Sequence, residues 1–222
     1  MTQLLLGIAP EWSPSLDNFV AGRNVELLSA LRHALDQTSA INSLYLWGDP
    51  GSGKSHLLQA AVAWAQDASM PSCYLRGSMP DPATLEDAQV VALDDVETLD
   101  EAAQIALFAV YNRLRESNGM LLVSGTAAPA QLQVRDDLRT RLGWGLVYQV
   151  QALNDDEKAL ALNQHAQARG FTLPPEVTQY LLRHGRRDLP ALLAVLDALD
   201  AHCLRLKRAP SVPLLKEVMQ AG

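Results

Sequence analysis

The chain has 222 residues, of which 48% are apolar and 19% are charged, the composition of a globular protein with a substantial core. This length suits one domain of ordinary size and a smaller second one. The net charge of −7 argues against a protein that binds nucleic acid on its own, because neutralising phosphates requires clustered Lys and Arg. No run approaches the roughly 18 apolar residues of a membrane span, and no signal peptide is recognisable. We therefore expect a cytoplasmic protein with no membrane partner.

The two cysteines, Cys73 and Cys203, lie far apart in apolar runs. This placement predicts two buried free thiols in a reducing compartment. The five histidines are scattered along the chain. Because neither residue type shows metal-ligand spacing, we expect no metal site built from them.

A complete phosphate-binding loop occupies residues 48–55. It fits the pattern G-x-x-x-x-G-K-[ST], and its members are Gly48, Asp49, Pro50, Gly51, Ser52, Gly53, Lys54 and Ser55. An apolar run precedes it and apolar residues at helical spacing follow it, which is the strand, turn and helix that the motif requires. The glycines let backbone N–H groups converge on phosphate oxygens, Lys54 can reach the β- and γ-phosphates, and the Ser55 hydroxyl can ligate Mg²⁺. The loop predicts binding of a nucleoside di- or triphosphate, ADP or ATP, with Mg²⁺.

Short apolar strands alternate with helices as far as residue 150. We expect strands at 43–47, 73–76, 90–95, 120–124 and 146–150. A helix around 101–115 is expected to turn Ile105, Phe108 and Leu114 inward. This alternation predicts an α/β fold with a parallel sheet. The phosphate loop and the end of the strand at 90–95 then meet at the carboxyl edge, where such sheets bind ligands.

The strand at 90–95 ends in two carboxylates, Asp94 and Asp95. Apolar residues followed by acids are typical of a Walker B strand, in which Asp94 would hold Mg²⁺ through its water shell. Asp95 stands where a carboxylate would polarise the attacking water. Asp is one methylene shorter than the Glu usual at this position, so it suits water activation less well.

From Asn154 onward the pattern predicts helices only. Asn154 or Asp155 can cap a helix that runs to about residue 169, where Gly170 can end it. A second helix follows a Pro-Pro pair, a third carries leucines at three- and four-residue spacing, and a short fourth one comes last. We expect an α-helical lid at 153–222 beside a nucleotide-binding domain at 16–152.

Three stretches resemble the AAA+ ATPases of the DnaA type, the bacterial replication initiators: residues 48–60 (GDPGSGKSHLLQA), 17–22 (DNFVAG) and 138–146 (LRTRLGWGL). The resemblance covers nearly the whole chain. It implies an AAA+ P-loop fold with a five-stranded parallel sheet, flanking helices and a small α-helical lid. It also places Phe19 and Val20 against the adenine and adds His56 to the nucleotide-binding residues.

With the lid ending near residue 222, we expect no counterpart of the initiators' C-terminal DNA-binding domain. This plan resembles the Hda-type regulators, the clamp-dependent inactivators of DnaA. Residues 105–115 (IALFAVYNRLR) resemble a helix of these regulators. Residues 3–8 (QLLLGI) resemble their sliding-clamp peptide, with Gln3, Leu4, Leu6 and Ile8 as clamp-binding residues in an extended or flexible segment at 1–15. Apart from the resemblance, these residues could equally start the chain without structure or add an edge strand.

The resemblance also assigns arginines. Arg141 matches the arginine finger, which is projected in trans into a neighbouring subunit's nucleotide site. Arg187 matches the sensor 2 arginine of the lid, with Arg186 as the competing choice. The family's sensor 1 Asp or Asn is replaced by Thr126, for which Ser124 is a possible substitute. Together with Asp95, this departure predicts weak intrinsic ATP hydrolysis.

The resemblance therefore implies a nucleotide-bound regulator of replication initiation. It would bind the DNA-loaded sliding clamp (the polymerase β subunit), contact DNA only through the clamp, and stimulate hydrolysis of DnaA-bound ATP, so preventing over-initiation. The alternative is an AAA+ helicase loader or remodeller driven by its own ATP turnover; a DNA-binding initiator is a third reading that the acidic charge disfavours. The choice between ADP and ATP, and homo-oligomer formation, stay open.

Overall fold

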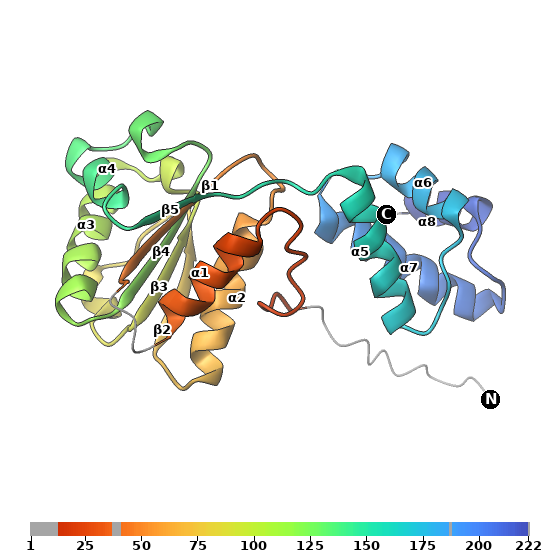
Figure 1. The fold of residues 1–222 in the computed structure, drawn as a ribbon, viewed down its shortest axis with the longest axis horizontal. Helices are drawn as coiled ribbons and strands as arrows, with labels where there is room; N and C mark the ends of the chain where they lie inside the picture. The colour runs from red at the N-terminus through yellow and green to blue at the C-terminus, as the bar shows by residue number, and fades with distance from the viewer. Residues whose placement is uncertain (1–12, 37–40, 187, 222) are drawn as a thin grey trace.

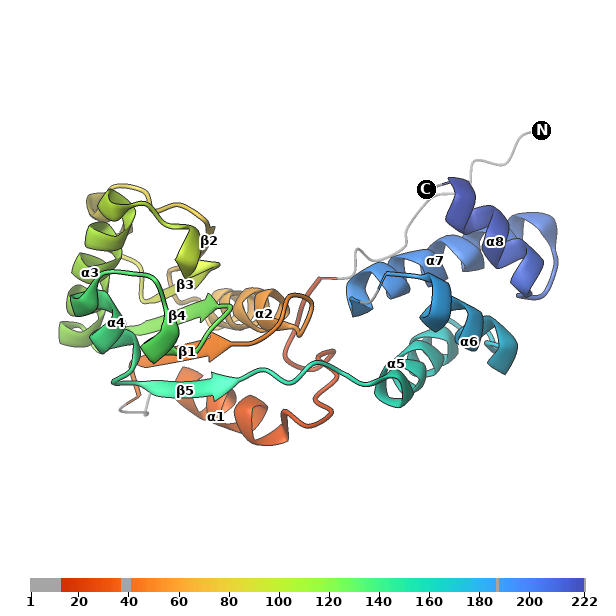
Figure 2. The same ribbon diagram turned by 90° about the horizontal axis from the view of Figure 1, so that it is seen from above.

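The computed structural model describes residues 13–36, 41–186 and 188–221. An α/β body contains the sheet, and four helices form a second body that is joined to it by the segment after the last strand (Figures 1 and 2). The two bodies have separate hydrophobic cores.

The sheet has five strands in the order β2-β3-β4-β1-β5, and all neighbouring pairs are parallel. The strands are β1 (Ser43–Trp47), β2 (Ser72–Arg76), β3 (Val90–Asp94), β4 (Met120–Gly125) and β5 (Leu146–Gln149). Strand β4 lies between β1 and β3, so three carboxyl ends meet side by side. The predicted parallel α/β fold is confirmed, and every expected strand is present within one residue of its expected bounds.

Helices cover both faces of the sheet. They are α1 (Val25–Leu35) and α2 (Lys54–Asp67) on one face, and α3 (Glu101–Glu116) and α4 (Asp136–Leu142) on the other. Three short 3₁₀ turns complete the connections: η1 (Pro82–Leu85), η2 (Val96–Thr98) and η3 (Pro129–Gln131). Buried apolar side chains from the strands contribute to both layers of core, as a doubly covered parallel sheet requires.

The expectation that α3 turns Ile105 inward is wrong. Ile105 is 51% exposed, whereas Leu107 and Leu114 are buried and Phe108 is half-buried. The buried stripe follows positions 104, 107, 110–111 and 114, which is the spacing of one helix face. Ile105 is a single residue, and hence about 100°, away from that stripe.

The lid consists of α5 (Asp155–Ala168), α6 (Pro175–His184), α7 (Leu189–Leu206) and α8 (Val212–Ala221). Asn154 caps α5 in a capping box: its side-chain oxygen accepts from the Glu157 N–H at 2.8 Å, and the Glu157 carboxylate accepts from the Asn154 N–H at 2.7 Å. The choice between Asn154 and Asp155 is thereby settled. Gly170 follows the helix with a φ of 84°, the left-handed conformation that favours glycine.

Both cysteines are free, but only Cys203 is buried, and Cys73 is half-buried. The prediction of two buried thiols is therefore confirmed for Cys203 and wrong for Cys73. Desolvation raises the pKa of both thiols, which keeps them protonated and unreactive at neutral pH. Within the described residues, no helix is long and apolar enough to cross a membrane.

Candidate nucleotide site

The phosphate loop connects β1 to α2 through three glycines with positive φ: Gly48 at 151°, Gly51 at 79° and Gly53 at 107°. At Gly48 a Cβ would lie 2.6 Å from the carbonyl oxygen of Val150, and at Gly53 it would lie 2.9 Å from the Phe19 ring. Conformation and space therefore both require glycine here. No described side chain caps α2, so the N–H groups of its first turn are available to bind an anion.

Lys54 is buried at the start of α2, with 6% of its surface exposed. Its ammonium donates to the carbonyl oxygens of Gly48 at 2.7 Å and Asp49 at 3.0 Å. Burial lowers the pKa of Lys54, and nearby carboxylates, Asp94 first, oppose that effect. The Ser52 hydroxyl is buried without a hydrogen-bond partner among the described residues. An unsatisfied hydroxyl and a buried cation within a cradle of N–H groups fit a phosphate.

Asp94 is fully buried at the end of β3. One carboxylate oxygen accepts from the Tyr74 hydroxyl at 2.8 Å, and the other accepts from the Ser124 hydroxyl. The Ser124 oxygen in turn accepts from the backbone N–H of Asp95 at 3.2 Å. Ser124 thus ties β4 to the acidic end of β3, while Thr126 is exposed. Burial raises the pKa of Tyr74 to about 12, so its hydroxyl remains a donor.

Asp95 leaves the strand in the left-handed conformation, with φ 58°. Its carboxylate forms an ion pair with Arg76, Oδ2 to Nε 2.9 Å, at the end of the neighbouring strand β2. One oxygen of the carboxylate that would polarise the attacking water is thus already engaged. Sequence reasoning missed Arg76 and Tyr74, although both belong to the last three residues of a predicted strand at the ligand-binding edge.

A second part of the site lies where residues 18–20, the phosphate loop and the lid meet. The Phe19 and His56 rings are 5.4 Å apart, and the His56 Nε2 lies 2.9 Å from the Ser15 carbonyl oxygen. Desolvation lowers the pKa of His56, so the ring is neutral at pH 7. The cavity is lined by Asn18, Phe19, Val20, Gly51, Ser52, Gly53, His56, Leu153, Lys158, Leu189 and Pro190. Aromatic and aliphatic surfaces of this kind suit the faces of a flat, uncharged base.

Sequence reasoning missed the four lid residues of this cavity, because nothing in the local pattern around them distinguishes a ligand contact from the core or surface of the lid. The start of α7 also lies close to the loop: a Cβ on Gly51 would be 3.3 Å from the Asp188 Cβ. Arg186 is paired with Asp188 at 3.1 Å. Arg187 lies outside the described residues, as do Gln3, Leu4, Leu6 and Ile8, so their assigned roles stay predictions.

Ser55 and Asp94 are the two residues expected to hold Mg²⁺. No group of three or more His, Cys, Asp or Glu suited to a metal occurs in the described residues. Mg²⁺ is usually held by one or two side chains plus water and substrate phosphates, so the assignment of Ser55 and Asp94 stays a prediction.

Arg141 lies at the opposite edge of the sheet from the phosphate loop. The turn after α4 leads into β5, which runs parallel to β1, so it lies beside the amino end of β1. A five-residue strand separates this edge from the loop by roughly 16 Å. The Arg141 guanidinium stacks on Trp144, 3.9 Å from the ring centroid, and forms no ion pair with the described carboxylates. Nearby Arg139, in contrast, is paired with Asp136 at 2.7 Å.

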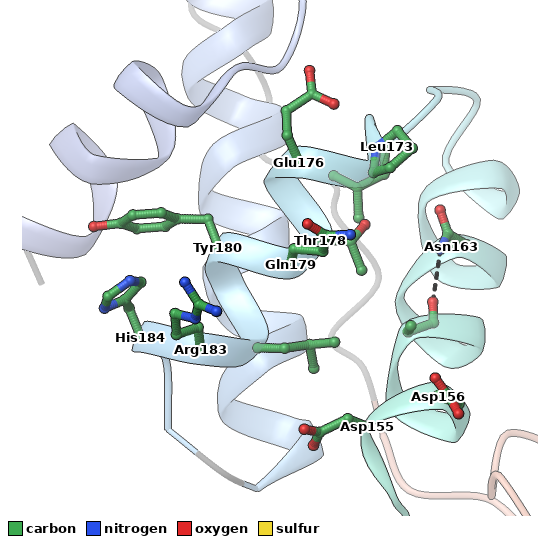
Figure 3. Close-up of a pocket in the computed structure, with 13 residues that line it drawn as sticks. Asp155, Asp156, Asn163, Leu173, Glu176, Thr178, Gln179, Tyr180, Arg183 and His184 are labelled. Carbon is green, nitrogen blue, oxygen red and sulfur yellow. Dashed lines mark hydrogen bonds between the residues drawn. The ribbon is translucent and has the colours of Figure 1, made fainter.

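A separate cavity of about 730 Å³ lies on the lid between α5 and α6 (Figure 3). Asp155 and Asp156 line one side of it, and Glu176 and Arg183 line the other. None of the phosphate-loop residues contributes to this cavity.

A phosphate loop after β1, an acidic strand β3 separated from it by β4, and a helical lid define an AAA+ P-loop ATPase fold. The family model for the bacterial DnaA ATPase domain matches residues 83–149, and the model described as "Hda, lid domain" matches residues 155–219. The chain belongs to the DnaA-related AAA+ proteins and carries a lid of the Hda type.

Solved structures show the same fold. Domain III of the Thermotoga maritima replication initiation protein DnaA is 19% identical, with 93% of this chain and 95% of that chain covered and a TM-score of 0.75. Aquifex aeolicus DnaA bound to AMPPCP is 22% identical, with 84% and 65% covered and a TM-score of 0.73. A Thermotoga maritima RuvB mutant is 17% identical, with 94% and 72% covered and a TM-score of 0.71.

Proposed function

We propose that this chain binds ADP or ATP with Mg²⁺. The phosphates would lie on residues 48–55, the adenine would lie between Phe19, Val20 and His56, and Ser55 and Asp94 would hold the metal. The unsatisfied Ser52 hydroxyl and the buried Lys54 ammonium support this assignment. So does the Aquifex DnaA structure, which is bound to AMPPCP, a nucleotide analogue. Arg187 is proposed as the lid residue that senses the nucleotide.

We further propose that the chain is a regulator of DnaA that stimulates hydrolysis of DnaA-bound ATP and thereby limits replication initiation. One observation carries this proposal: Arg141 is oriented by an aromatic ring, unpaired with any described carboxylate, and at the wrong edge of the sheet for its own nucleotide. A permanently charged fork in that position suits a phosphoryl group held by another molecule.

The alternative of a loader driven by its own ATP turnover is less well supported. Asp95, the residue expected to activate water, is engaged by Arg76. Thr126 is exposed, and Ser124 is already committed to Asp94 and the Asp95 N–H. These contacts favour a slow intrinsic ATPase.

The remaining organisation is also proposed. Residues 16–152 form the nucleotide-binding domain and residues 153–222 the lid, in line with their separate cores. Residues 1–15 carry the clamp-binding peptide, which would bring the regulator to DNA through the sliding clamp.

The regulator hypothesis can be tested by mixing the protein with clamp-loaded DNA and DnaA bound to labelled ATP, and following ADP formation. Arg141→Ala should reduce the stimulation by on the order of 10³-fold, the usual contribution of an arginine finger in trans, and should leave ADP binding unchanged and the chain folded. Arg139→Ala, on the same short helix, is the matched control and should stimulate normally. If Arg141→Ala stimulates as well as the unaltered protein, the proposed role of this chain is wrong.

A further inference from the structure

The guanidinium of Arg141 lies inside a group of three aromatic rings. Its central carbon is 3.9 Å from the Trp144 centroid, 5.7 Å from that of Phe108 and 6.0 Å from that of Tyr111. Tyr111 is buried and Phe108 half-buried on α3, while Trp144 is 57% exposed. A planar cation that stacks on a ring keeps the N–H donors at its rim free for hydrogen bonds.

Backbone contacts fix the position of Trp144 in the chain. The Trp144 N–H donates to the Arg141 carbonyl oxygen at 3.1 Å, which closes the turn after α4. Gly145 lies so close to β1 that a Cβ would come within 2.3 Å of the Ser43 carbonyl oxygen. The turn is thereby packed against Ser43, the first of four consecutive buried residues of β1, and Trp144 is held next to Arg141.

We propose that Trp144 is a positioning residue for Arg141: it holds the guanidinium in its working orientation before the partner arrives. The inference rests on the proposed function. A long, flexible side chain without an ion pair loses rotamer freedom when it enters a partner's site. An arginine side chain that is stacked on a ring has already lost much of that freedom. More of the energy of its interaction with the partner's phosphates is then available to speed hydrolysis.

The alternative role for the exposed Trp144 is a direct contact with DnaA that contributes to docking. The two roles differ kinetically. Loss of a docking contact raises the regulator concentration needed for half-maximal stimulation, whereas loss of a positioning residue lowers the maximal rate. Exposed aromatic rings contribute to both kinds of interaction, so only this division of the effect separates them.

The experiment measures DnaA-ATP hydrolysis at increasing regulator concentration, on clamp-loaded DNA, for Trp144→Ala and Trp144→Phe. We expect the maximal rate to fall roughly 5- to 30-fold for Ala, as loss of a cation–π contact would give, and less for Phe, which retains a ring face. Trp64→Ala is the control, because Trp64 is 37% exposed on α2, away from Arg141. In an Arg141→Ala background, Trp144→Ala should have no further effect.

A second measurement needs no partner. Stacking should shield Trp144 from acrylamide, so Arg141→Ala should increase fluorescence quenching in the wild-type background and not in the Trp144→Phe background. An unchanged maximal rate for folded Trp144→Ala, while Arg141→Ala is inactive, would overturn the positioning role and leave the proposed function standing. Full activity of Arg141→Ala would overturn both. Unaltered quenching would refute the stack itself.

Discussion

Lys54 shows how a single residue is prepared for a ligand. Its ammonium has left water and is satisfied by two carbonyl oxygens of its own loop, Gly48 and Asp49. Phosphate oxygens would be far stronger acceptors for this cation, and the nearby carboxylate of Asp94 keeps it charged in spite of burial. Lys54 should nevertheless be replaceable without loss of the fold, because the glycines hold the loop in shape.

Lys54→Ala should therefore weaken ADP binding by roughly 10- to 100-fold, the value of a charge-assisted hydrogen bond, and leave the fold intact. Calorimetry with ADP measures the affinity, and circular dichroism checks the fold. Lys216→Ala on α8 is the control and should bind ADP normally. Unchanged ADP affinity in folded Lys54→Ala protein would defeat the assignment of the loop.

Ser124 and Thr126 offer a matched pair for the question of which residue replaces the usual sensor. Ser124→Ala removes the partner of one Asp94 carboxylate oxygen, while the other keeps Tyr74, and it leaves the Asp95 N–H without its acceptor. This should lower the free energy of unfolding by about 1–3 kcal/mol. Thr126→Ala, at an exposed position, should change it by less than about 0.5 kcal/mol. Thermal melts distinguish the two, with about 2–4 °C expected per kcal/mol. Equal melting temperatures would contradict the role given to Ser124.

At the scale of the element, secondary structure could be predicted wherever the local sequence pattern favoured a single kind of element. The strands were predictable because each is a short apolar run bounded by turn residues. Ile105 was misplaced because α3 is apolar around much of its circumference, so the pattern did not identify the buried face. Arg76 and Tyr74 were missed because their roles depend on β2 lying beside β3, and strand order cannot be read from a strand's own residues.

The cap of α5 is an element-scale device with a measurable effect. Asn154→Ala removes the acceptor for the Glu157 N–H and should lower the free energy of unfolding by about 1 kcal/mol. Asp155→Ala is the neighbouring control, because this exposed side chain serves only a long 3.9 Å contact with Lys158. Urea unfolding monitored by helical circular dichroism compares the two. A larger loss for Asp155→Ala would show that the helix is capped differently in solution.

At the scale of the whole molecule, the fold separates its working surfaces. The carboxyl edge of the sheet carries the phosphate loop and faces the lid, and the amino edge carries Arg141. In the proposed mechanism, a nucleotide bound to this chain and the nucleotide reached by Arg141 would therefore belong to different molecules. This arrangement suits a protein that is itself held in one nucleotide state while it acts on the nucleotide of a partner.

The proposed clamp peptide would be a third surface, independent of the other two. Changing Gln3, Leu4 and Leu6 together to Ala should abolish binding to the sliding clamp, because an extended peptide of this kind binds through its apolar side chains and one polar anchor. ADP affinity should stay unchanged, since the proposed nucleotide-binding residues, the loop at 48–55 with Phe19, Val20 and His56, are not altered in this variant. Co-elution with the clamp on size exclusion, together with ADP calorimetry, measures both. The triple variant should also lose stimulation of DnaA-ATP hydrolysis on clamp-loaded DNA although Arg141 is intact, because Arg141 would no longer be brought close to DnaA. A triple variant that still co-elutes with the clamp would show that docking uses another surface.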